Sequence, residues 1–238
     1  MAMAARRPVA SHLAACASSG VLAWPPLLRA CASNAGRPLV ATRTSNVGKL
    51  AGALSAQLRR DSELAERRAI WPSISAVGPT AAYMALKAVI IADSYVRDVL
   101  AGQSLVVVPA KQMAVKTAYM PESAGLLLTV RTVPSLDLVL PEKPELFSAQ
   151  DTNVGHLAGF MSGVLKKQAA ATVGSMGDKA TSNTLKATLI AQKYLQGESL
   201  GESECLALLP RFGEFQQGDE DRKVRMLLTC LRLQAPKQ

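Results

Sequence analysis

The sequence predicts a two-layer α/β fold in which one βαβαββ unit occurs twice in tandem. The first observation is an internal repeat: residues 45–60, SNVGKLAGALSAQLRR, match residues 152–167, TNVGHLAGFMSGVLKK, at eight of sixteen positions. Three further matches follow in the same order, pairing 86–95 with 185–194, 104–110 with 205–211 and 126–133 with 226–233. Within each copy, β-favouring runs alternate with stretches of helical periodicity. Duplication of one unit of about 95 residues is the simplest explanation.

The first half of each unit is expected to hold one strand and one helix. Short β-favouring runs begin the two copies, at residues 40–44 and 146–150. Ser45 and Thr152 follow these runs and offer hydroxyl groups as helix N-caps. Apolar residues then recur at helical spacing up to the basic pair that ends each matched segment, and this charge suits a helix C-terminus.

The second half of each unit is expected to hold a strand, a helix and two closing strands. The first of these strands ends at Gly78 or Gly177, where a tight turn is expected. Pro79 suits the first position of the following helix, and Asp178 suits the corresponding turn of the second copy. The helix in the first copy is apolar on most of its circumference, so it should be well covered. The closing strands are expected at 104–109 and 126–133, and at 205–210 and 225–233.

These elements divide the chain into four segments. They are a leader at 1–37, a first repeat at 38–133, a Pro-rich linker at 134–145 and a second repeat at 146–238. The linker has a net acidic balance and is expected to be semi-extended.

The leader has the composition of an organelle transit peptide. It is rich in Ala, Ser, Leu and Arg, and the first acidic residue of the chain is Asp61. Polar residues and the Trp-Pro-Pro turn at 24–26 interrupt its apolar run, which argues against a secretory signal. We expect a mitochondrial matrix protein, with a plastid as the alternative.

The composition favours a polyanionic partner. Lys and Arg number 27 against 18 acidic residues, which gives a net charge of +9, and the chain stays basic when the leader is subtracted. Such a balance favours nucleic acid or an acidic membrane surface. No stretch of the sequence is long and apolar enough to cross a bilayer, so no membrane insertion is expected.

The sequence offers no catalytic or metal-binding constellation. Cys205 and Cys230 lack a short metal-ligand spacing and are expected to be small buried residues on strands. His156 is the only histidine outside the leader, so no metal cluster or His-based triad can be assembled from it. Residues 46–49, NVGK, lack the upstream glycine and the following Ser or Thr of a P-loop. We therefore expect no enzyme activity, no cofactor and no metal.

The repeated motifs are specific enough to compare with a family. In the first copy they are Asn46-Val47, residues 50–54 (LAGAL), residues 76–78 (AVG), residues 86–89 (LKAV), Ile91-Ala92 and Val108-Pro109. In the second copy they are Asn153-Val154, residues 157–159 (LAG), Gly177, residues 185–187 (LKA) and Ile190-Ala191. This pattern resembles the stage V sporulation protein S family, whose domain is similar in fold to the Alba superfamily of nucleic-acid-binding proteins.

The resemblance implies dimer-like pairing and a nucleic-acid-binding surface. Alba proteins pair as dimers, so two tandem Alba-like units are expected to form an intramolecular pseudo-dimer. Nucleic acid meets the loop before the first helix, basic residues near it and the hairpin between the last two strands. The implied residues in the first repeat are Arg43, Asn46, Lys49, Lys87, Lys111 and Lys116. Those in the second repeat are Asn153, His156, Lys186, Arg211, Arg222, Lys223 and Arg225.

Several of these residues also have a structural interpretation. Exposed amides at a helix N-terminus, reinforced by Lys or Arg, hold phosphate oxygens, but Asn46 and Asn153 are equally suited to start a helix. Lys87 and Lys186 can instead extend along the apolar helix surface to reach solvent. Gly52 and Gly159 are interpreted as positions of close helix packing.

The second repeat departs from the first in charge. His156 replaces Lys49, Asp151 replaces Thr44, and residues 219–221 form an acidic run. Whether the second repeat still binds nucleic acid therefore stays open.

The sequence thus favours a non-enzymatic protein that binds structured RNA, with ribosomal RNA of an organellar ribosome as the expected partner. Aromatic residues make up only 4% of the chain, so backbone and shape recognition is expected over base stacking. One alternative is an organellar DNA-binding nucleoid protein. Another is an assembly module that holds ribosomal or other proteins and does not touch nucleic acid.

Overall fold

The fold was taken from a computed structural model. It describes residues 38–63, 71–112, 125–135, 143–196, 198–201, 204–215 and 223–234. The predicted leader at 1–37 and most of the predicted linker lie outside these ranges.

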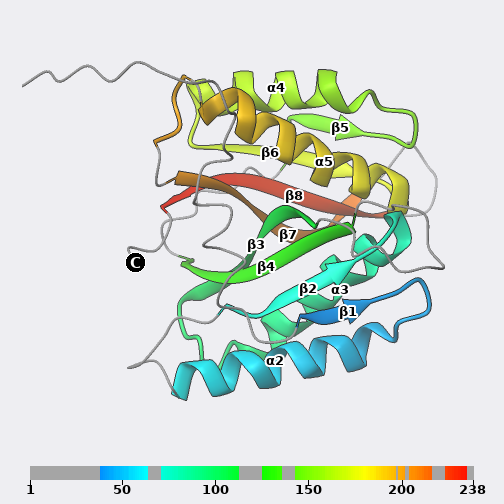
Figure 1. Cartoon of the computed structure of the whole chain (residues 1–238), viewed down its shortest axis with the longest axis vertical. Helices are drawn as coiled ribbons and strands as arrows, with labels where there is room; N and C mark the ends of the chain where they lie inside the picture. The colour runs from blue at the N-terminus through cyan, green and yellow to red at the C-terminus, as the bar shows by residue number, and fades with distance from the viewer. Residues whose placement is uncertain are drawn as a thin grey trace, which may run out of the picture.

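Both copies have the predicted element order. The first contains β1 (Leu39–Ala41), α2 (Val47–Glu63), β2 (Ser73–Ala76), α3 (Pro79–Val96), β3 (Gln103–Gln112) and β4 (Gly125–Pro134). The second contains β5 (Leu146–Ser148), α4 (Val154–Lys167), β6 (Ala170–Ser175), α5 (Gly177–Gln196), β7 (Glu204–Phe215) and β8 (Lys223–Gln234). The predicted βαβαββ pattern is therefore confirmed in each repeat (Figure 1).

The two repeats share one eight-stranded sheet in the order β1-β2-β4-β3-β7-β8-β6-β5. This order reads the same from either edge when the strands of one repeat are exchanged for those of the other. At the centre, Val107 of β3 pairs with Leu208 of β7 in antiparallel orientation. These two residues occupy equivalent positions in the repeats, so a pseudo-two-fold axis passes through their pairing. The predicted intramolecular pseudo-dimer is confirmed.

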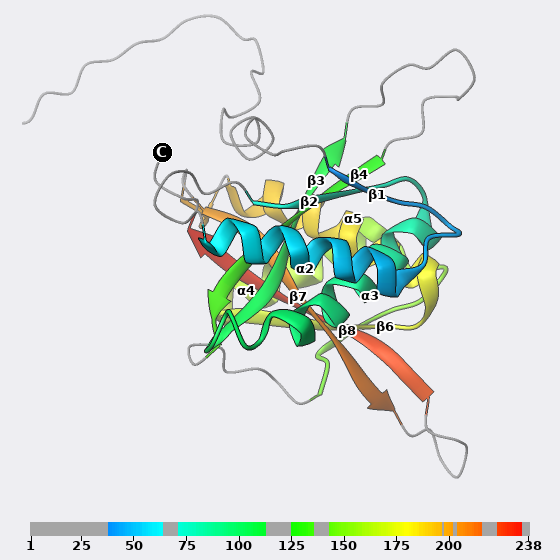
Figure 2. The ribbon, with the colours of Figure 1, turned by 90° about the horizontal axis from the view of Figure 1, so that it is seen from below.

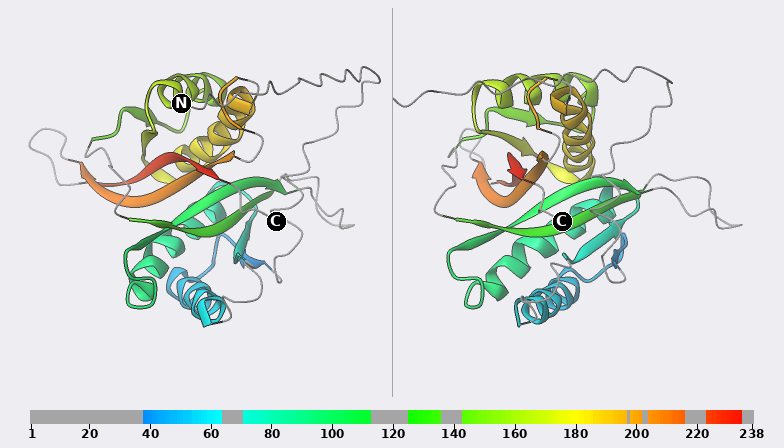
Figure 3. Two further views of the ribbon diagram at one scale, coloured as in Figure 1. Left: turned by 90° about the vertical axis from the view of Figure 1, so that its left-hand side faces the viewer. Right: turned by 60° about the vertical axis from the view of Figure 1, so that its left-hand side comes forward.

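The helices cover one face of the sheet, and α3 and α5 pack against each other at its centre. Figure 3 shows the central strands in front, with the helices of the first repeat below them and those of the second above. The main core lies under them and draws fully buried side chains from both repeats, including Leu86, Leu185 and Leu208. Burying a leucine side chain contributes about 1.5–3 kcal/mol. Because this core crosses the boundary between the repeats, we expect the two repeats to unfold together.

A smaller apolar cluster lies on the opposite face of the central strands. It contains Val106 and Val108 of β3 with Cys205, Ala207 and Leu209 of β7. Side chains alternate between faces along a strand, so the two central strands contribute to both cores. Cys205 and Cys230 are buried on strands, as predicted, and burial raises the pKa of the Cys230 thiol to about 12.

The central helices start as the sequence predicts. Gly78 and Gly177 have φ angles of 89° and 86°, which an L side chain rarely adopts. Pro79 opens α3 directly after the first of these glycines. Across the repeat boundary, the Thr80 hydroxyl donates a 2.6 Å hydrogen bond to the Asp178 carboxylate in the first turn of α5. This contact ties the starts of the two helices together.

The predicted packing role of Gly52 and Gly159 is wrong. A Cβ atom added at either glycine would meet no heavy atom within 4 Å beyond its immediate neighbours. Gly159 is exposed on α4, because α5 contacts a different face of that helix. Neither position requires glycine for helix packing.

Candidate nucleic-acid interface

One end of the molecule brings together the starts of the described helices and the open ends of both hairpins. β1 and β2 are parallel, as are β5 and β6, so their carboxyl ends point the same way within each half-sheet. Ala76 at the end of β2 pairs with Leu126 near the start of β4, and Ser175 pairs with Met226 in the same way. Figure 2 shows the two hairpins diverging from this end.

We call this region the hairpin end. It comprises the loops at 42–46 and 149–153, the starts of α3 and α5, and the strand ends at 112, 125, 215 and 223.

Asparagine side chains begin the first helix of each repeat. Asn46 Oδ1 accepts a 3.0 Å hydrogen bond from the Lys49 amide. Asn153 Oδ1 accepts bonds from the amides of Gly155 and His156 at 3.0 and 3.1 Å. The carboxamide oxygens thus take up the amides of Lys49, Gly155 and His156, which were expected to bind phosphate. The amino group of each carboxamide and the positive field of the helix end stay available to a ligand.

The prediction that Ser45 and Thr152 cap these helices is wrong by one residue. The Ser45 hydroxyl accepts a 2.9 Å hydrogen bond from the Thr42 amide, and the Thr152 hydroxyl accepts a 2.7 Å bond from the Ala149 amide. Both hydroxyls therefore close the turn before the helix. They have no part in capping because they are already engaged there, and the next residue supplies the cap.

The glycine two residues after each capping asparagine leaves space beside the carboxamide oxygen. A Cβ added at Gly48 would lie 3.4 Å from Asn46 Oδ1, and one at Gly155 would lie 3.3 Å from Asn153 Oδ1. The asparagine of the shared Asn-Val-Gly sequence is thus explained by helix-start chemistry.

The two loops present different charges at the hairpin end. Arg43 and Lys49 of the first repeat are exposed. The corresponding region of the second repeat exposes His156 and Asp151. The first loop is therefore the more favourable of the two for a phosphate backbone.

The arginines of the second hairpin lie on the sheet face away from the helices. Met226 and Leu208 belong to the helix-side core, so alternation places Arg225 and Arg211 on the other face. Arg225 lies over the Phe147 ring, 5.6 Å from its centroid. Arg211 is half-buried, and this burial lowers its pKa. Its Nε and Nη2 atoms are buried and have no hydrogen-bond partner in the described part of the chain.

Three predicted hairpin residues cannot be placed as side chains. Lys116 and Arg222 lie outside the described residues. Lys223 begins β8, but its side chain is outside the description.

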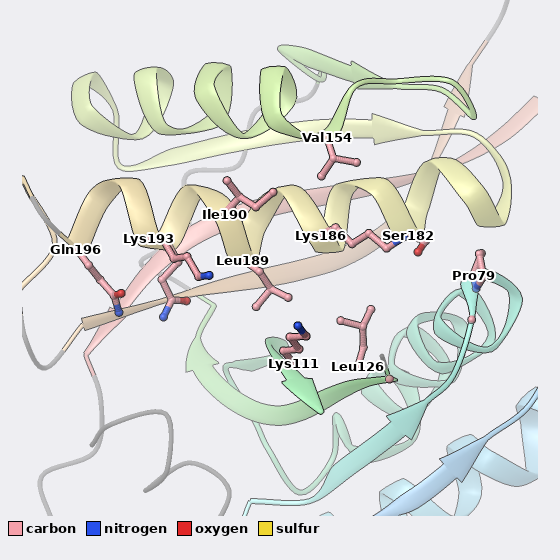
Figure 4. A pocket seen from close by; sticks show the side chains of 13 residues that line it. Pro79, Lys111, Leu126, Val154, Ser182, Lys186, Leu189, Ile190, Lys193 and Gln196 are labelled. Atoms are coloured by element: carbon pink, nitrogen blue, oxygen red, sulfur yellow. The ribbon is translucent and has the colours of Figure 1, made fainter. Parts of the chain in front are cut away.

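The structure brings Lys111 and Lys186 together although they come from different repeats. Both line a groove between α5 and the first hairpin (Figure 4). Lys87, the counterpart of Lys186 on α3, is half-buried and places its ammonium 4.4 Å from the centroid of the Tyr83 ring. Apart from Lys87, the predicted cations whose side chains are described therefore fall into three groups: the loops at the hairpin end, this groove and the outer sheet face.

A comparison with protein families agrees with this architecture. The family model described as Stage V sporulation protein S matches residues 39–120 and 146–231. The chain belongs to the stage V sporulation protein S family. Both matched segments fall within the two repeats that the internal duplication defines. A comparison with curated proteins finds no match.

Two stage V sporulation protein S domains in one chain explain the shape of the hairpin end. Each domain supplies one loop, two helix starts and one hairpin, and the pseudo-two-fold axis places both sets at one end of the shared sheet. The Alba-like fold of these domains suggests nucleic acid as the class of ligand.

Sequence reasoning missed two cationic residues of this family member. Lys193 also lines the groove, and its spacing of seven residues from Lys186 places both on one helix face, a signal that was present in the sequence. Arg131 lies over the Trp71 ring on the outer sheet face, 5.5 Å from its centroid. That pair is distant in sequence, so no local pattern indicated it.

The remaining chemistry of the described residues is limited. Within the described ranges, no group of three or more His, Cys, Asp or Glu side chains could hold a metal ion. In the same part of the chain, none of the helices combines the length and apolarity needed to cross a membrane.

Proposed function

We propose that this protein binds structured RNA without catalysing a reaction, as a component of a mitochondrial ribosome. The observation that supports this most is the hairpin end. There the pseudo-two-fold axis gathers two exposed loops, the positive ends of the helices and two diverging hairpins. The basic composition of the chain supports the same ligand.

The chemistry of this surface favours contacts with the RNA backbone. Arg43 and Lys49 supply exposed positive charge, and the Asn46 amino group supplies a neutral donor. Phosphate contacts of this kind position a nucleic acid without reading its sequence. Two projecting hairpins suit shape recognition of a folded RNA, in which side chains cannot read the deep, narrow major groove.

DNA of an organellar nucleoid is the closest rival ligand. Purifying the native protein and treating the copurified nucleic acid with ribonuclease or deoxyribonuclease separates the two. Loss of the bound material with ribonuclease alone is expected. Loss of the bound material with deoxyribonuclease alone would identify DNA as the ligand instead of RNA.

A protein assembly module is the second candidate, and paired exposed apolar residues favour it. Val40 and Phe147 occupy equivalent positions on the two edge strands and are 66% and 62% exposed. Val77 and Met176 are a second such pair at the ends of β2 and β6, at 51% and 49%. Single exposed apolar residues are common on soluble proteins, so these pairs support the module less strongly than the hairpin end supports RNA.

Salt dependence separates RNA binding from protein assembly. Binding of the purified chain to an RNA hairpin should be followed by fluorescence anisotropy between 50 and 200 mM salt. RNA affinity should fall steeply, with a slope of about 0.7–0.9 in the logarithm for each phosphate contact. A chain that binds no RNA even at the lower salt concentration, yet copurifies with proteins, would favour the assembly module.

The proposed mitochondrial location can be tested with the N-terminal segment alone. A fluorescent reporter fused to residues 1–43 is expected to enter mitochondria. A plastid signal would move the proposed ribosome to that organelle, and a diffuse cytosolic signal would contradict both. Sedimentation of the native protein on a density gradient should then place it with ribosomal subunits.

A further inference from the structure

A groove between the two repeats has an apolar and basic lining that the exposed loops of the hairpin end lack. It runs along α5, faces the open end of the first hairpin at Lys111 and Leu126, and has a volume of about 440 Å³. This lies within the range of about 300–1,000 Å³ that is usual for small-ligand sites. Its length from Ser182 to Gln196 corresponds to about 21 Å of helix.

The groove combines an apolar surface with positive charge. Leu126, Leu189 and Ile190 supply apolar surface, and among the described residues no Asp or Glu side chain lines the groove. Neither Lys111 nor Lys186 forms an ion pair or hydrogen bond with another described residue. Figure 4 shows the Lys111 side chain directed toward Leu189 across the groove. A ligand that fits this lining is anionic and carries an apolar or planar part.

Polar groups along the groove restrict the chemical class of the ligand further. Ser182, Gln192 and Gln196 supply a hydroxyl and two carboxamides. The Gln192 oxygen accepts a 3.4 Å hydrogen bond from the Leu206 amide, so its amino group is left to donate elsewhere. A fatty acyl chain has no partner for these groups. A nucleobase has donors and acceptors on its edge together with an apolar face.

The pseudo-symmetric position on α3 lacks these features. Tyr83 stands there in place of Ser182, and Phe212 stands in place of Lys111. The Tyr83 ring lies on α3 under the Lys87 ammonium, at the position where α5 carries the smaller Ser182. The duplicated unit has therefore diverged so that the small and basic residues are on the α5 side.

We propose that this groove binds an unpaired nucleotide of the RNA, with the base against Leu126 and Leu189 and the adjacent phosphates at Lys111 and Lys186. The inference rests on the proposed function and specifies which part of a structured RNA the protein selects. The site comes from both repeats, because Lys111 and Leu126 belong to the first and α5 belongs to the second. Separate repeats would not form it.

The test compares two RNA hairpins that differ only in a bulge of two unpaired nucleotides. The full chain is expected to bind the bulged hairpin about tenfold more tightly, a difference that corresponds to about 1.4 kcal/mol of base and phosphate contacts. Ser182→Tyr places in the groove the side chain that the first repeat carries at the same position. Lys186→Gln removes one charge from an exposed side chain without changing the buried surface. Both variants should lower the preference to about twofold or less.

Lys87→Gln is the matched control, because it removes the equivalent lysine on α3. It should keep the tenfold preference, because the Lys87 ammonium lies over the Tyr83 ring and Lys87 does not line the groove. Equal binding of both hairpins by the parent chain would overturn the groove assignment and leave the proposed function standing. So would a preserved preference in Lys186→Gln. Failure to bind either RNA would instead contradict the proposed function.

Discussion

Replacing Asn153 with Ala isolates the helix-start role of the Asn-Val-Gly motif. The substitution removes two hydrogen bonds, to the amides of Gly155 and His156. Loss of such a cap costs about 1 kcal/mol, within a range of 0.5–2 kcal/mol. The cost should appear in global unfolding because α4 buries Leu157 and Met161 in the shared core. For a domain of this size, the expected fall in Tm by calorimetry is about 2–4 °C.

Asn153→Asp separates capping from ligand binding. The carboxylate keeps an acceptor for the two amides, and its charge at a helix N-terminus adds about 0.3–1 kcal/mol. This variant should therefore be at least as stable as the parent. It loses the amino donor and adds negative charge, so its RNA affinity should fall below that of the Ala variant. If Asp lowers the Tm as much as Ala does, the reasoning about the cap is wrong.

Three further predictions follow from other positions. Replacing Arg43 and Lys49 together with Ala should reduce the salt slope of RNA binding by about 1.4–1.8 with little change in Tm, and an unaltered binding isotherm would remove that loop from the interface. Gly159→Ala should raise stability by up to about 1 kcal/mol in denaturant unfolding, because the added Cβ meets open space and alanine favours the helix; a clear loss would restore the packing role. The hydrogen bond from Thr80 lowers the pKa of Asp178 below its ordinary value of 3.8, so the stability it contributes is present above that pH and is lost as pH falls through the folded-state pKa. Thr80→Val should thus lower the Tm at pH 7 more than at about pH 2.5, and an equal loss at both would contradict the linkage.

The fold could be predicted from the sequence because the repeat supplied two independent copies of each signal. A short β-favouring run is weak evidence alone, but the same run at residues 40–44 and 146–150 before a matched helix is much stronger. The pseudo-dimer followed from the resemblance together with the duplication. The structure then showed where the axis passes, at the pairing of Val107 with Leu208.

Local competition between side chains limited the prediction of the helix starts. Ser45 and Asn46 are both good caps, and propensity alone does not decide between neighbours. The turn before the helix decides, since the Thr42 amide takes the Ser45 hydroxyl and leaves the cap to Asn46. The prediction for Gly52 was wrong for a different reason, because glycine in a helix is compatible with either close packing or open solvent.

The groove depends on tertiary structure that no local pattern contains. The family resemblance implies Lys111 and Lys186 separately, as a hairpin residue and a helix residue that are 75 positions apart. Their proximity requires the crossing of β3 and β7, which places the first hairpin beside the helix of the second repeat. The replacement of Tyr83 by Ser182 between copies was visible in the sequence. Its meaning depended on knowing that this position faces the other repeat.

The two repeats differ in charge although they are related by a pseudo-two-fold axis, and this difference predicts which repeat the proposed RNA contacts most. The axis places two equivalent loops at one end, but Arg43 and Lys49 lie on one side of it, and Asp151 and His156 lie on the other. The groove adds Lys111 from the hairpin of the same repeat as the more basic loop. A polyanion that bound symmetrically would meet Asp151 at a cost, whereas one that runs from the first loop along the first hairpin to α5 stays beside lysines and arginines. We therefore expect crosslinks from a bound RNA to map chiefly to the first repeat and α5, and an even distribution over both loops would show that the axis also governs binding.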